Sequence, residues 1–559
     1  TTKCSEDSGI QNPGAISQKA NFQFHKKAFA LRRLFFFFLP IRSPQPPPMA
    51  IAYSNSDSLT AFLIKADHQH HHHHHHHHHY YSSFSVFFPY LLFFLLFSSP
   101  PTAYAFTGDV AEDSKNRRAD LFVQILKDEA VGRLNELGKV SDADRYLERT
   151  FLSPASIKAR FLLQKWMEDA GLRTWVDCMG NLHGRTEGRN ASAEALLIGS
   201  HLDTVVDAGK FDGALGIISA ISALKVLNMN GKLEELKRPI EVIAFSDEEG
   251  VRFQSTFLGS AAIAGILPVS SLEISDKSGM TIKDVITESG VQITEENLLQ
   301  LKYDRKSVWG YVEVHIEQGP VLEWSGFPLG VVRGIAGQTR LKVTVRGSQG
   351  HAGTVPMPMR QDPMAASAEL IVQLEKLCKQ PESYLSFDGH CTDSTLKSLS
   401  TSLVCTVGEI STWPSASNVI PGQVTFTVDL RTIDDIGREA VIYEFSNQVH
   451  NICSSRSVSC NIERKHDANA IISDSELSSQ LKSAASTALK KMVGEIQEEV
   501  PVLMSGAGHD AMAISHLTKV GMLFVRCRGG ISHSPAEHVL DDDIWAAGLA
   551  VLEFLENHL

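Results

Sequence analysis

Short apolar runs separated by helical stretches are the feature that most constrains the fold of this chain. The runs cover residues 195–199, 240–245, 311–316 and 522–525, and residues 216–227 show helical spacing between two of them. Strands that are apolar on both sides must be covered on both faces, and helical connections join parallel strands. The pattern therefore predicts an α/β domain with a mostly parallel central sheet.

Residues 331–471 show a different pattern of predicted strands and helices. This segment contains three predicted strands and two predicted helices, at 340–346, 403–410, 423–430, 363–377 and 436–452. Such a combination suits a small α+β sandwich. Because the run at 522–525 returns to the first pattern, we predict that 331–471 is inserted into a catalytic domain made of residues 106–330 and 472–559.

The first 105 residues differ in charge from the rest of the chain. They hold 8 Lys and Arg against 4 Asp and Glu, whereas the remainder holds 44 against 60. The first methionine is Met49, which follows a proline-rich run, and we expect residues 1–48 to be a non-native or disordered extension. The acidic balance of the remainder argues against a nucleic-acid partner, which would need a basic surface.

Residues 49–105 combine a histidine run with a signal-like segment. The run at 70–79 is unbroken histidine, a low-complexity tract to which we assign no catalytic role. The apolar residues 84–97 and the small residues ending at Ala105 have the form of a secretory signal cleaved after Ala105, with an uncleaved anchor as the alternative. We expect no membrane span in the mature chain, because no apolar run of about 18 residues follows. If the chain enters the lumen, Asn190 lies in a usable Asn-Ala-Ser glycosylation triplet.

The eight cysteines do not suggest a cysteine-based function. No CxxC pair occurs, and the spacings show neither a zinc knuckle nor a disulfide framework. Thiol catalysis is therefore not expected.

Imidazoles and carboxylates occur at the end of each predicted core strand. In chain order they are His201, Asp203, Asp212, Glu248, Glu249, His315 and His533. In an open α/β sheet, ligands bind outside the carboxyl ends of the strands, so four strand ends would deliver these groups to one crevice. Each group alone could be structural: a histidine as a hydrogen-bonder, the acidic pair as a solvated turn, Asp212 as an Asx-turn. Their coincidence favours a shared site.

That set has the chemistry of a site for two divalent cations. Imidazole and carboxylate ligands suit Mn²⁺ or Zn²⁺ better than Ca²⁺. Asp212 can bridge two ions, and Asp203 can accept the N–H of the His201 imidazole and fix its tautomer from behind. Of the paired Glu248 and Glu249, one would bind metal and the other would take a proton from the attacking water.

Six motifs together resemble a known family. Residues 199–204, 248–250 and 350–354 read Gly-Ser-His-Leu-Asp-Thr, Glu-Glu-Gly and Gly-His-Ala-Gly-Thr, and they resemble the di-metal amidohydrolases of the aminoacylase and carboxypeptidase G clan. Segments 315–320, 417–422 and 531–535 narrow the resemblance to the N-carbamoyl-amino-acid and ureide amidohydrolase branch. The resemblance covers about residues 112–559. It implies a di-metal aminopeptidase-like catalytic domain interrupted by a smaller α+β dimerisation and lid domain.

The resemblance also implies a role for individual side chains. The metal ligands it implies are His201, Asp212, Glu249, His315 and His533, with Asp212 bridging two ions, Mn²⁺ first and Zn²⁺ as the alternative. Glu248 is implied to be the general base. In a homodimer, His351 would stabilise the oxyanion in the site of the partner subunit. The implied substrate-binding residues are Gln318, His351, Asn418, Arg431, Gly506 and Ala507.

The substrate that the resemblance implies is allantoate, hydrolysed to ureidoglycine, ammonia and carbon dioxide. Arg431 offers a planar fork for a carboxylate, whereas Asn418 and Gln318 offer donor and acceptor to a ureido group. Arg431 could instead pair with Asp434 or Asp435. Ureidoglycolate or an N-carbamoyl-L-amino acid is the alternative substrate, and a metallopeptidase or aminoacylase is the third interpretation. The signal-like segment fits the association of the family's plant members with the endoplasmic reticulum.

Three further histidines remain as candidates. His509 follows a glycine-rich turn, and we expect it either behind the metal ligands or facing the substrate. No specific role is predicted for His466 or His538. A binding module without activity is disfavoured, because no ligand position of the family pattern is missing.

Overall fold

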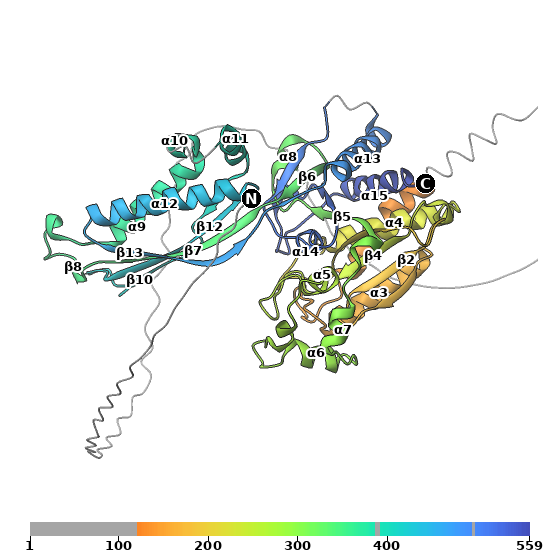
Figure 1. The fold of residues 1–559 in the computed structure, drawn as a ribbon, viewed down its shortest axis with the longest axis horizontal. Coiled ribbons are helices and arrows are strands. Elements are labelled where there is room, and N and C mark those ends of the chain that lie inside the picture. Colours follow the sequence, from red (N-terminus) through yellow and green to blue (C-terminus); the bar gives the residue numbers. More distant parts are fainter. Residues whose placement is uncertain (1–119, 386–391, 495–497) are drawn as a thin grey trace, which may run out of the picture. The chain divides into compact units, whose positions relative to one another are not determined.

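The computed structural model describes residues 120–385, 392–494 and 498–559 (Figure 1). The predicted extension 1–48 and the histidine and signal-like segment 49–105 lie outside the described residues. None of the helices within the described ranges is both long enough and apolar enough to cross a membrane.

A nine-stranded mixed sheet forms the larger layer, in the order β1-β2-β4-β3-β5-β16-β6-β14 with β15 beside β6. Its strands are β1 (Arg173–Val176), β2 (Leu182–Thr186), β3 (Ala195–His201), β4 (Ile240–Phe245), β5 (Val308–Ile316), β6 (Leu329–Ile335), β14 (Ile471–Ile472), β15 (Val502–Ser505) and β16 (Val520–Val525). The four predicted strands β4, β3, β5 and β16 are neighbours and pair in parallel. Antiparallel pairs flank them on both sides. The α/β class is confirmed, and its parallel part is the four-strand centre of a mixed sheet.

Helices cover both faces of this sheet, as strands without a polar side require. Leu196 and Ile198 point into a core shared with α4 (Ala214–Met229), α13 (Ser475–Val493) and α15 (Asp541–Glu556). The alternate residues Ala195 and Leu197 point into the opposite core, with α5 (Leu258–Ala264) and α14 (Asp510–Ile514). The two-residue period of a strand thus explains why β3 is buried along its whole length.

The boundaries of α3 (Pro154–Asp169) follow directly from its sequence. The N–H of Ser156 donates to the Ser153 hydroxyl at 3.1 Å, Pro154 takes the first helical position, and Gly171 follows with φ +83°. The remaining helices around this sheet are η1 (Gln124–Glu129), α2 (Ala130–Leu137), η2 (Leu233–Glu235), η3 (Val269–Glu273), α6 (Ile282–Glu288), α7 (Glu295–Gln300), η4 (Arg305–Ser307), α8 (Val321–Ser325) and η6 (Arg528–Gly530).

A five-stranded antiparallel sheet forms a second layer, in the order β10-β12-β7-β13 with β9 beside β12. Its strands are β7 (Gly337–Arg346), β9 (Val404–Thr406), β10 (Ile410–Trp413), β12 (Gln423–Thr432) and β13 (Ser459–Ala468). Its helices are η5 (Met357–Met359), α9 (Pro363–Lys379), α10 (Glu382–Leu385), α11 (Asp393–Ser402) and α12 (Asp435–Ser455). We call residues 337–468 the small-sheet layer. Alternate residues of β12 are buried and pack with α9 and α12 in a core of their own.

The chain leaves the larger sheet and returns to it around this layer. The predicted boundary at 331 falls inside β6, and residue 471 opens β14, so both boundary strands pair within the larger sheet. A two-stranded ribbon of β8 (Gly350–His351) and β11 (Val419–Ile420) also belongs to this segment.

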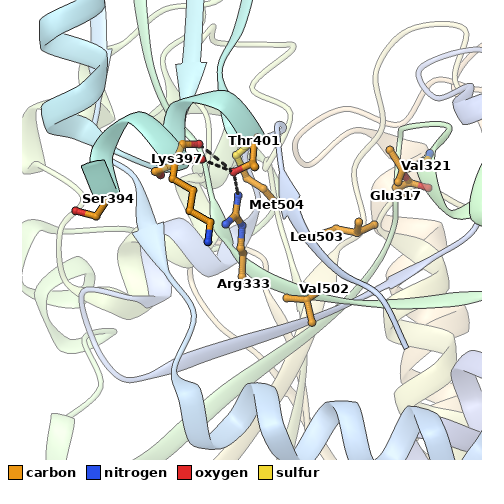
Figure 2. Close-up of a pocket in the computed structure, with 10 residues that line it drawn as sticks. Glu317, Val321, Arg333, Ser394, Lys397, Thr401, Val502, Leu503 and Met504 are labelled. Atoms are coloured by element: carbon orange, nitrogen blue, oxygen red, sulfur yellow. Dashed lines mark hydrogen bonds between the residues drawn. The ribbon is translucent and has the colours of Figure 1, made fainter. Parts of the chain in front are cut away.

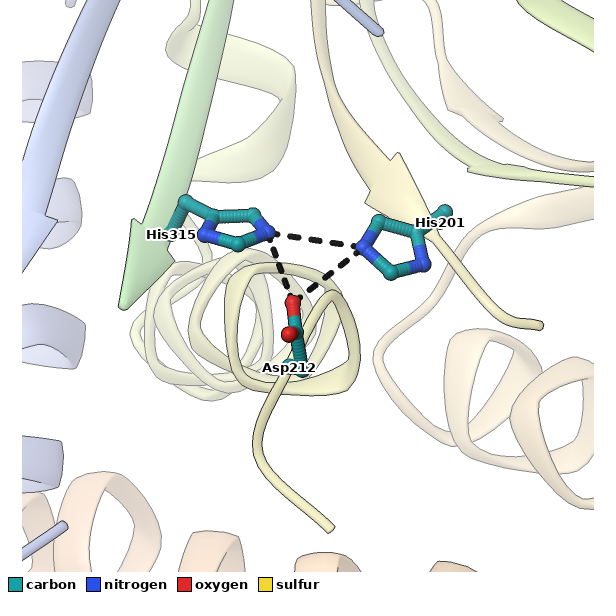
Figure 3. Close-up of side chains that lie close together, drawn as sticks. All are labelled: His201, Asp212 and His315. Carbon is teal, nitrogen blue, oxygen red and sulfur yellow. Dashed lines mark hydrogen bonds and ion pairs between the residues drawn. The ribbon is translucent and has the colours of Figure 1, made fainter. Parts of the chain in front are cut away.

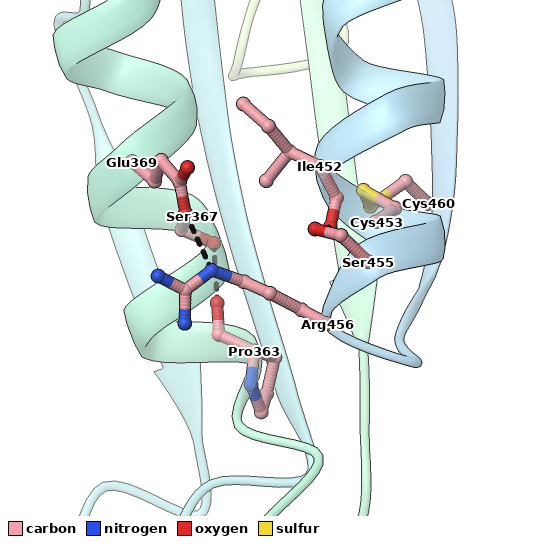
Figure 4. Close-up of a disulfide and its surroundings, with 8 residues drawn as sticks. All are labelled: Pro363, Ser367, Glu369, Ile452, Cys453, Ser455, Arg456 and Cys460. Atoms are coloured by element: carbon pink, nitrogen blue, oxygen red, sulfur yellow. Dashed lines mark hydrogen bonds and ion pairs between the residues drawn. A yellow bond between two sulfur atoms is a disulfide. The ribbon is translucent and has the colours of Figure 1, made fainter.

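Two disulfides lie in the small-sheet layer, which the cysteine spacings do not predict. Cys378 of α9 is bonded to Cys405 of β9, and Cys453 of α12 is bonded to Cys460 of β13 (Figure 4). Each bond ties a helix to the sheet that it covers. Cys178 and Cys527, among the described cysteines, are free.

Candidate metal centre

His201 and His315 form the innermost part of the site because they end two neighbouring parallel strands. His201 is the last residue of β3, and His315 lies next to the end of β5. Both imidazoles are buried and face the Asp212 carboxylate (Figure 3). The Oδ1 atom of Asp212 lies 3.4 Å from Nε2 of His201 and 3.0 Å from Nε2 of His315.

Main-chain contacts set the tautomer of both imidazoles. Nδ1 of His201 lies 3.0 Å from the carbonyl oxygen of Asp203, and Nδ1 of His315 lies 2.9 Å from that of Ile316. A carbonyl only accepts, so Nδ1 carries the proton and the Nε2 lone pair of a neutral ring points towards Asp212. The sequence predicted that the Asp203 carboxylate would orient the His201 ring. The main-chain carbonyl of Asp203 makes this contact instead.

The convergence of three acceptors fits a cation. Oδ1 of Asp212 is buried and has no hydrogen-bond partner in the described structure. Burial alone would raise the pKa of Asp212, but His315 and His201 hold it well below its usual range. Burial alone would lower the pKa of His315, but Asp212 raises it. A divalent ion would satisfy the same orphaned oxygen and both lone pairs.

Two further groups of candidate ligands share residues with this one. His201 with Glu248 and Glu249, and Asp212 with Glu249 and His533, each bring one ligand atom within 4.8 Å of the others, as do His201, Asp212 and His315. Nε2 of His533 lies 3.2 Å from Glu249 and 3.4 Å from Oδ2 of Asp212. All five predicted ligands and Glu248 therefore lie together, and geometry alone does not separate the base from the ligands.

The Asp203 carboxylate holds the acidic pair in place. It accepts the backbone N–H of Glu248 at 3.0 Å and that of Glu249 at 3.1 Å. The pair follows β4, and Asp247 before it has φ +57°, a left-handed conformation that costs energy for a non-glycine residue. Burial and the neighbouring Glu249 raise the pKa of Glu248 well above its ordinary value, against the effect of His201.

Asp212 is fixed from the other side by residues that sequence reasoning mostly missed. Ser532 donates to its Oδ2 at 2.6 Å, and the Gln318 amide donates to the same atom at 2.9 Å. Glu537 accepts the backbone N–H of Asp212 at 3.2 Å. The next residue must be glycine, because Gly213 has φ +66° and a Cβ there would lie 2.4 Å from the His201 carbonyl.

A cavity of about 440 Å³ opens beside these ligands. Its lining includes, besides the six residues of the metal groups, Thr256, Phe257, Gln318, Ala336, Gln338, Arg340, Arg431, His466, Ala468, Gly506, Ala507, Gly508 and Met512. Predicted substrate-binding residues Gln318, Arg431, Gly506 and Ala507 are thus present. Gln338 and Arg340 were missed, although the alternation of β7 places them on one face of a strand.

Arg431 is held by groups other than those proposed from the sequence. Its Nε and Nη2 donate to the two carboxylate oxygens of Asp429 at 2.7 and 3.1 Å, and Nη1 donates to the Gly506 carbonyl at 2.7 Å. Asp434 instead caps α12 by accepting the Gly437 N–H. Asp429 also accepts from Arg340 at 3.1 Å, so one carboxylate orients two guanidinium groups.

His351 and Asn418 lie together but outside this cavity. They belong to the β8–β11 ribbon region, where the Ala352 N–H donates to the Asn418 carbonyl at 2.9 Å. The His351 ring is exposed, and its Nδ1 accepts the Gly353 N–H at 3.1 Å. The neutral ring therefore carries its proton on Nε2, as a free donor. Neither residue lines the cavity of its own chain.

His509 lies behind the metal ligands. It is buried, its Nε2 is 2.7 Å from the Ser505 hydroxyl, and its ring packs 4.4 Å from that of His315. Burial and His315 hold its pKa well below the ordinary value, so the ring is neutral. His466 lines the cavity, with Gln338 2.9 Å away, whereas His538 packs against Phe211.

Imidazoles and carboxylates gathered at the strand ends of a covered α/β sheet define the class as a metal-dependent hydrolase. The chain belongs to the peptidase family M20/M25/M40, a family of di-metal hydrolases, which it matches over residues 197–557.

Named relatives narrow that class. The chain is 76% identical over 460 residues to allantoate deiminase 2 of Glycine max, covering 82% of this chain and 95% of that one. It is 72% identical over 447 residues to allantoate deiminase of Arabidopsis thaliana, covering 80% and 85%. Among solved structures, an amidase of the hydantoinase/carbamoylase family from Burkholderia multivorans matches with a TM-score of 0.67 and 27% identity, covering 77% and 97%. The family resemblance seen in the motifs is thereby confirmed.

Proposed function

We propose that this protein hydrolyses allantoate to ureidoglycine, ammonia and carbon dioxide. High identity with two plant allantoate deiminases over most of the chain supports the substrate. The observation that carries the proposal is the gathering of His201, Asp212 and His315 around one unpartnered carboxylate oxygen.

The residues of the site divide the work of hydrolysis. Two divalent ions held by the imidazoles and carboxylates of this site would lower the pKa of water and polarise the ureido carbonyl. Glu248 takes the proton of the attacking water and passes it to the leaving nitrogen. Asp203 keeps the Glu248 main chain fixed while the proton moves, and Gln318 lies where its amide can meet a ureido group.

Release of ammonia is the direct test of this function. Purified protein reconstituted with Mn²⁺ is incubated with allantoate, and ammonia and ureidoglycine are measured over time. One ammonia per allantoate consumed is expected. Intact allantoate after incubation with fully metallated protein would contradict the proposal.

Manganese is our proposed native metal. The mixed imidazole and carboxylate set supports a first-row ion that accepts both nitrogen and oxygen ligands. Metal analysis of protein purified without chelators is expected to give two manganese ions per chain. Zinc at that ratio, with full activity, would replace manganese in the proposal.

We further propose a homodimer in which His351 and Asn418 serve the partner subunit's site. Their exposed position outside the cavity of their own chain, and the free Nε2 donor of His351, support this arrangement. Mixing inactive Glu248→Gln with inactive His351→Ala subunits should restore activity, because one composite site then has both residues. Absence of complementation in proven mixed dimers would contradict it.

An N-carbamoyl-L-amino acid or ureidoglycolate remains the competing substrate, because one of the matched solved structures is a hydantoinase/carbamoylase family amidase. The comparison of kcat/KM for allantoate, ureidoglycolate and N-carbamoyl-glycine under the same metal separates the three. Allantoate is expected to give the highest value.

Maturation in the endoplasmic reticulum is the proposal for localisation. The signal-like segment supports it, as do the two disulfides, which persist in oxidising compartments. Asn190 lies exposed in the loop between β2 and β3, in an Asn-Ala-Ser triplet. Sensitivity of the cellular protein to endoglycosidase, lost in Ser192→Ala, is expected. Protein accessible to protease in intact microsomes would contradict the localisation itself.

A further inference from the structure

A second cavity, of about 690 Å³, lies between the larger sheet and a helix of the small-sheet layer (Figure 2). β6 contributes Arg333, β15 contributes Val502, Leu503 and Met504, and α11 contributes Ser394, Lys397, Ser398 and Thr401. It shares no lining residue with the metal-bearing cavity, although Glu317 here and Gln318 there are sequence neighbours.

The two cations of this cavity are not neutralised. Within the described part of the chain, neither Arg333 nor Lys397 forms an ion pair. The guanidinium of Arg333 makes one long contact, donating from Nη2 to the Thr401 hydroxyl at 3.4 Å. Figure 2 shows both cationic side chains directed into the space between β6 and α11. Arg333 is half-buried and Lys397 is exposed at the mouth of the cavity. Two cations that face one space without a partner acid favour an anion between them.

The one acid in the lining is already committed. Both carboxylate oxygens of Glu317 accept backbone N–H groups at the start of α8, from Val321 at 2.8 Å and from Leu322 at 2.9 Å. The carboxylate therefore stabilises a helix start and does not reach the cations. Because no side chain of the lining supplies the counter-charge, the cavity has the donors of an anion site with that position open to a ligand.

The remaining lining indicates what else the ligand carries. Val321, Val502, Leu503 and Met504 supply an apolar wall, and the hydroxyls of Ser394 and Ser398 lie on the α11 side. Guanidinium, ammonium and hydroxyl donors suit a phosphate or carboxylate group, whereas the apolar wall suits a ring or short chain. We propose that this cavity binds a small organic anion with an apolar portion, at a site separate from the metal centre.

Calorimetric titration of the metallated full chain tests this site with three probes. Phenyl phosphate carries both features, inorganic phosphate only the charge, and phenol only the ring. We expect one saturable phenyl phosphate site per chain, about tenfold tighter than inorganic phosphate because of the buried ring, and no measurable binding of phenol. Equal affinities for phenyl phosphate and inorganic phosphate would overturn the apolar part of the proposal.

Charge-removing variants locate the binding. Arg333→Ala and Lys397→Ala should each weaken phenyl phosphate by about tenfold or more, since each removes a charge-assisted contact. Lys283→Ala, at an exposed position of α6 that is not part of this lining, is the matched control and should bind as the parent does. Arg333→Gln replaces Arg333→Ala if thermal melting shows the latter unfolded. If both cavity variants give the same binding heat and affinity for phenyl phosphate as the parent, the anion binds elsewhere, for example at the metal ligands. That result would overturn the proposal.

Discussion

The two walls of the metal-bearing cavity are built in different ways. On the larger-sheet wall, His201 and His315 are 1% and 2% exposed, and both are oriented by main-chain carbonyls. On the small-sheet wall, Arg340 and His466 are exposed, and their contacts are to side chains on neighbouring strands. The first wall is therefore fixed by the fold itself, whereas the second depends on side-chain pairs.

We infer from this difference that the larger-sheet wall carries out the reaction and that the small-sheet wall recognises the substrate. Groups held by buried backbone contacts need not reorganise when charge develops, which suits metal ligation and proton transfer. Arg431 and its neighbours line the more open part of the cavity, where we propose that the substrate binds. Changes to the first wall should therefore affect kcat and metal content, and changes to the second should affect KM.

Glu248→Gln should have the largest effect. The amide cannot take a proton, so kcat for allantoate should fall by about 10²–10⁴-fold, while metal content stays at two ions per chain. Steady-state kinetics and metal analysis on the same preparation give both values. Glu234→Gln, on an exposed 3₁₀ turn, is the control. Near-normal turnover in Glu248→Gln would remove the base assignment.

Ser532→Ala should have the second-largest effect. Its hydroxyl donates to the Asp212 carboxylate at 2.6 Å, and the loss of such a group supporting a metal ligand lowers metal affinity or activity by about 10–100-fold. Metal affinity measured by competition with a chelator tests it. The neighbouring Ser534→Ala, whose hydroxyl accepts only a backbone N–H of its own turn, should keep parental affinity. Equal affinities in the two variants would show that Ser532 does not support the metal.

The strand-end residues of this site were predictable because sheet geometry determines where they lie. Once β3, β4, β5 and β16 are parallel neighbours, their carboxyl ends must meet at one edge. Gln318 and His533 depend on more than this, since both have left-handed backbone angles, φ +56° and +55°. Local propensity gives no signal for such a conformation in a non-glycine residue.

What the sequence could not predict are contacts between side chains far apart in the chain. The alternating pattern of β12 places Asp429 on a face of the strand. The residues next to it in the sequence do not indicate that it binds Arg340, 89 positions away. The two disulfides were unpredictable for the same reason, because which cysteines pair depends on how α9 and α12 lie on the sheet. The outer antiparallel strands were missed because they are short or partly polar, so no continuous apolar run marks them.

Asp429→Asn should change substrate affinity with little effect on turnover. Its carboxylate orients Arg431 and Arg340, so an amide there leaves both guanidinium groups less fixed, and KM should rise by about 3–10-fold, the equivalent of about 1 kcal/mol. Metal content should not change. Glu463→Gln, in an exposed pair with Lys465 on β13 of the same sheet, is the matched control. A fall in kcat with unchanged KM would instead show that Asp429 acts in the reaction, like the residues of the larger-sheet wall.

The double variant Cys453→Ser, Cys460→Ser should have the smallest effect on activity and the clearest one on stability. The disulfide joins α12 to β13 with a sequence separation of 7, and closing so short a loop is worth about 2 kcal/mol. Because both cysteines are in the small-sheet layer, its urea transition should move to lower concentration while metal content and kcat stay parental. Cys178→Ser, a free cysteine near the larger sheet, controls for loss of a thiol. If metal is lost together with the small-sheet transition, the two walls unfold as one unit, and the separation of reaction from recognition would not extend to stability.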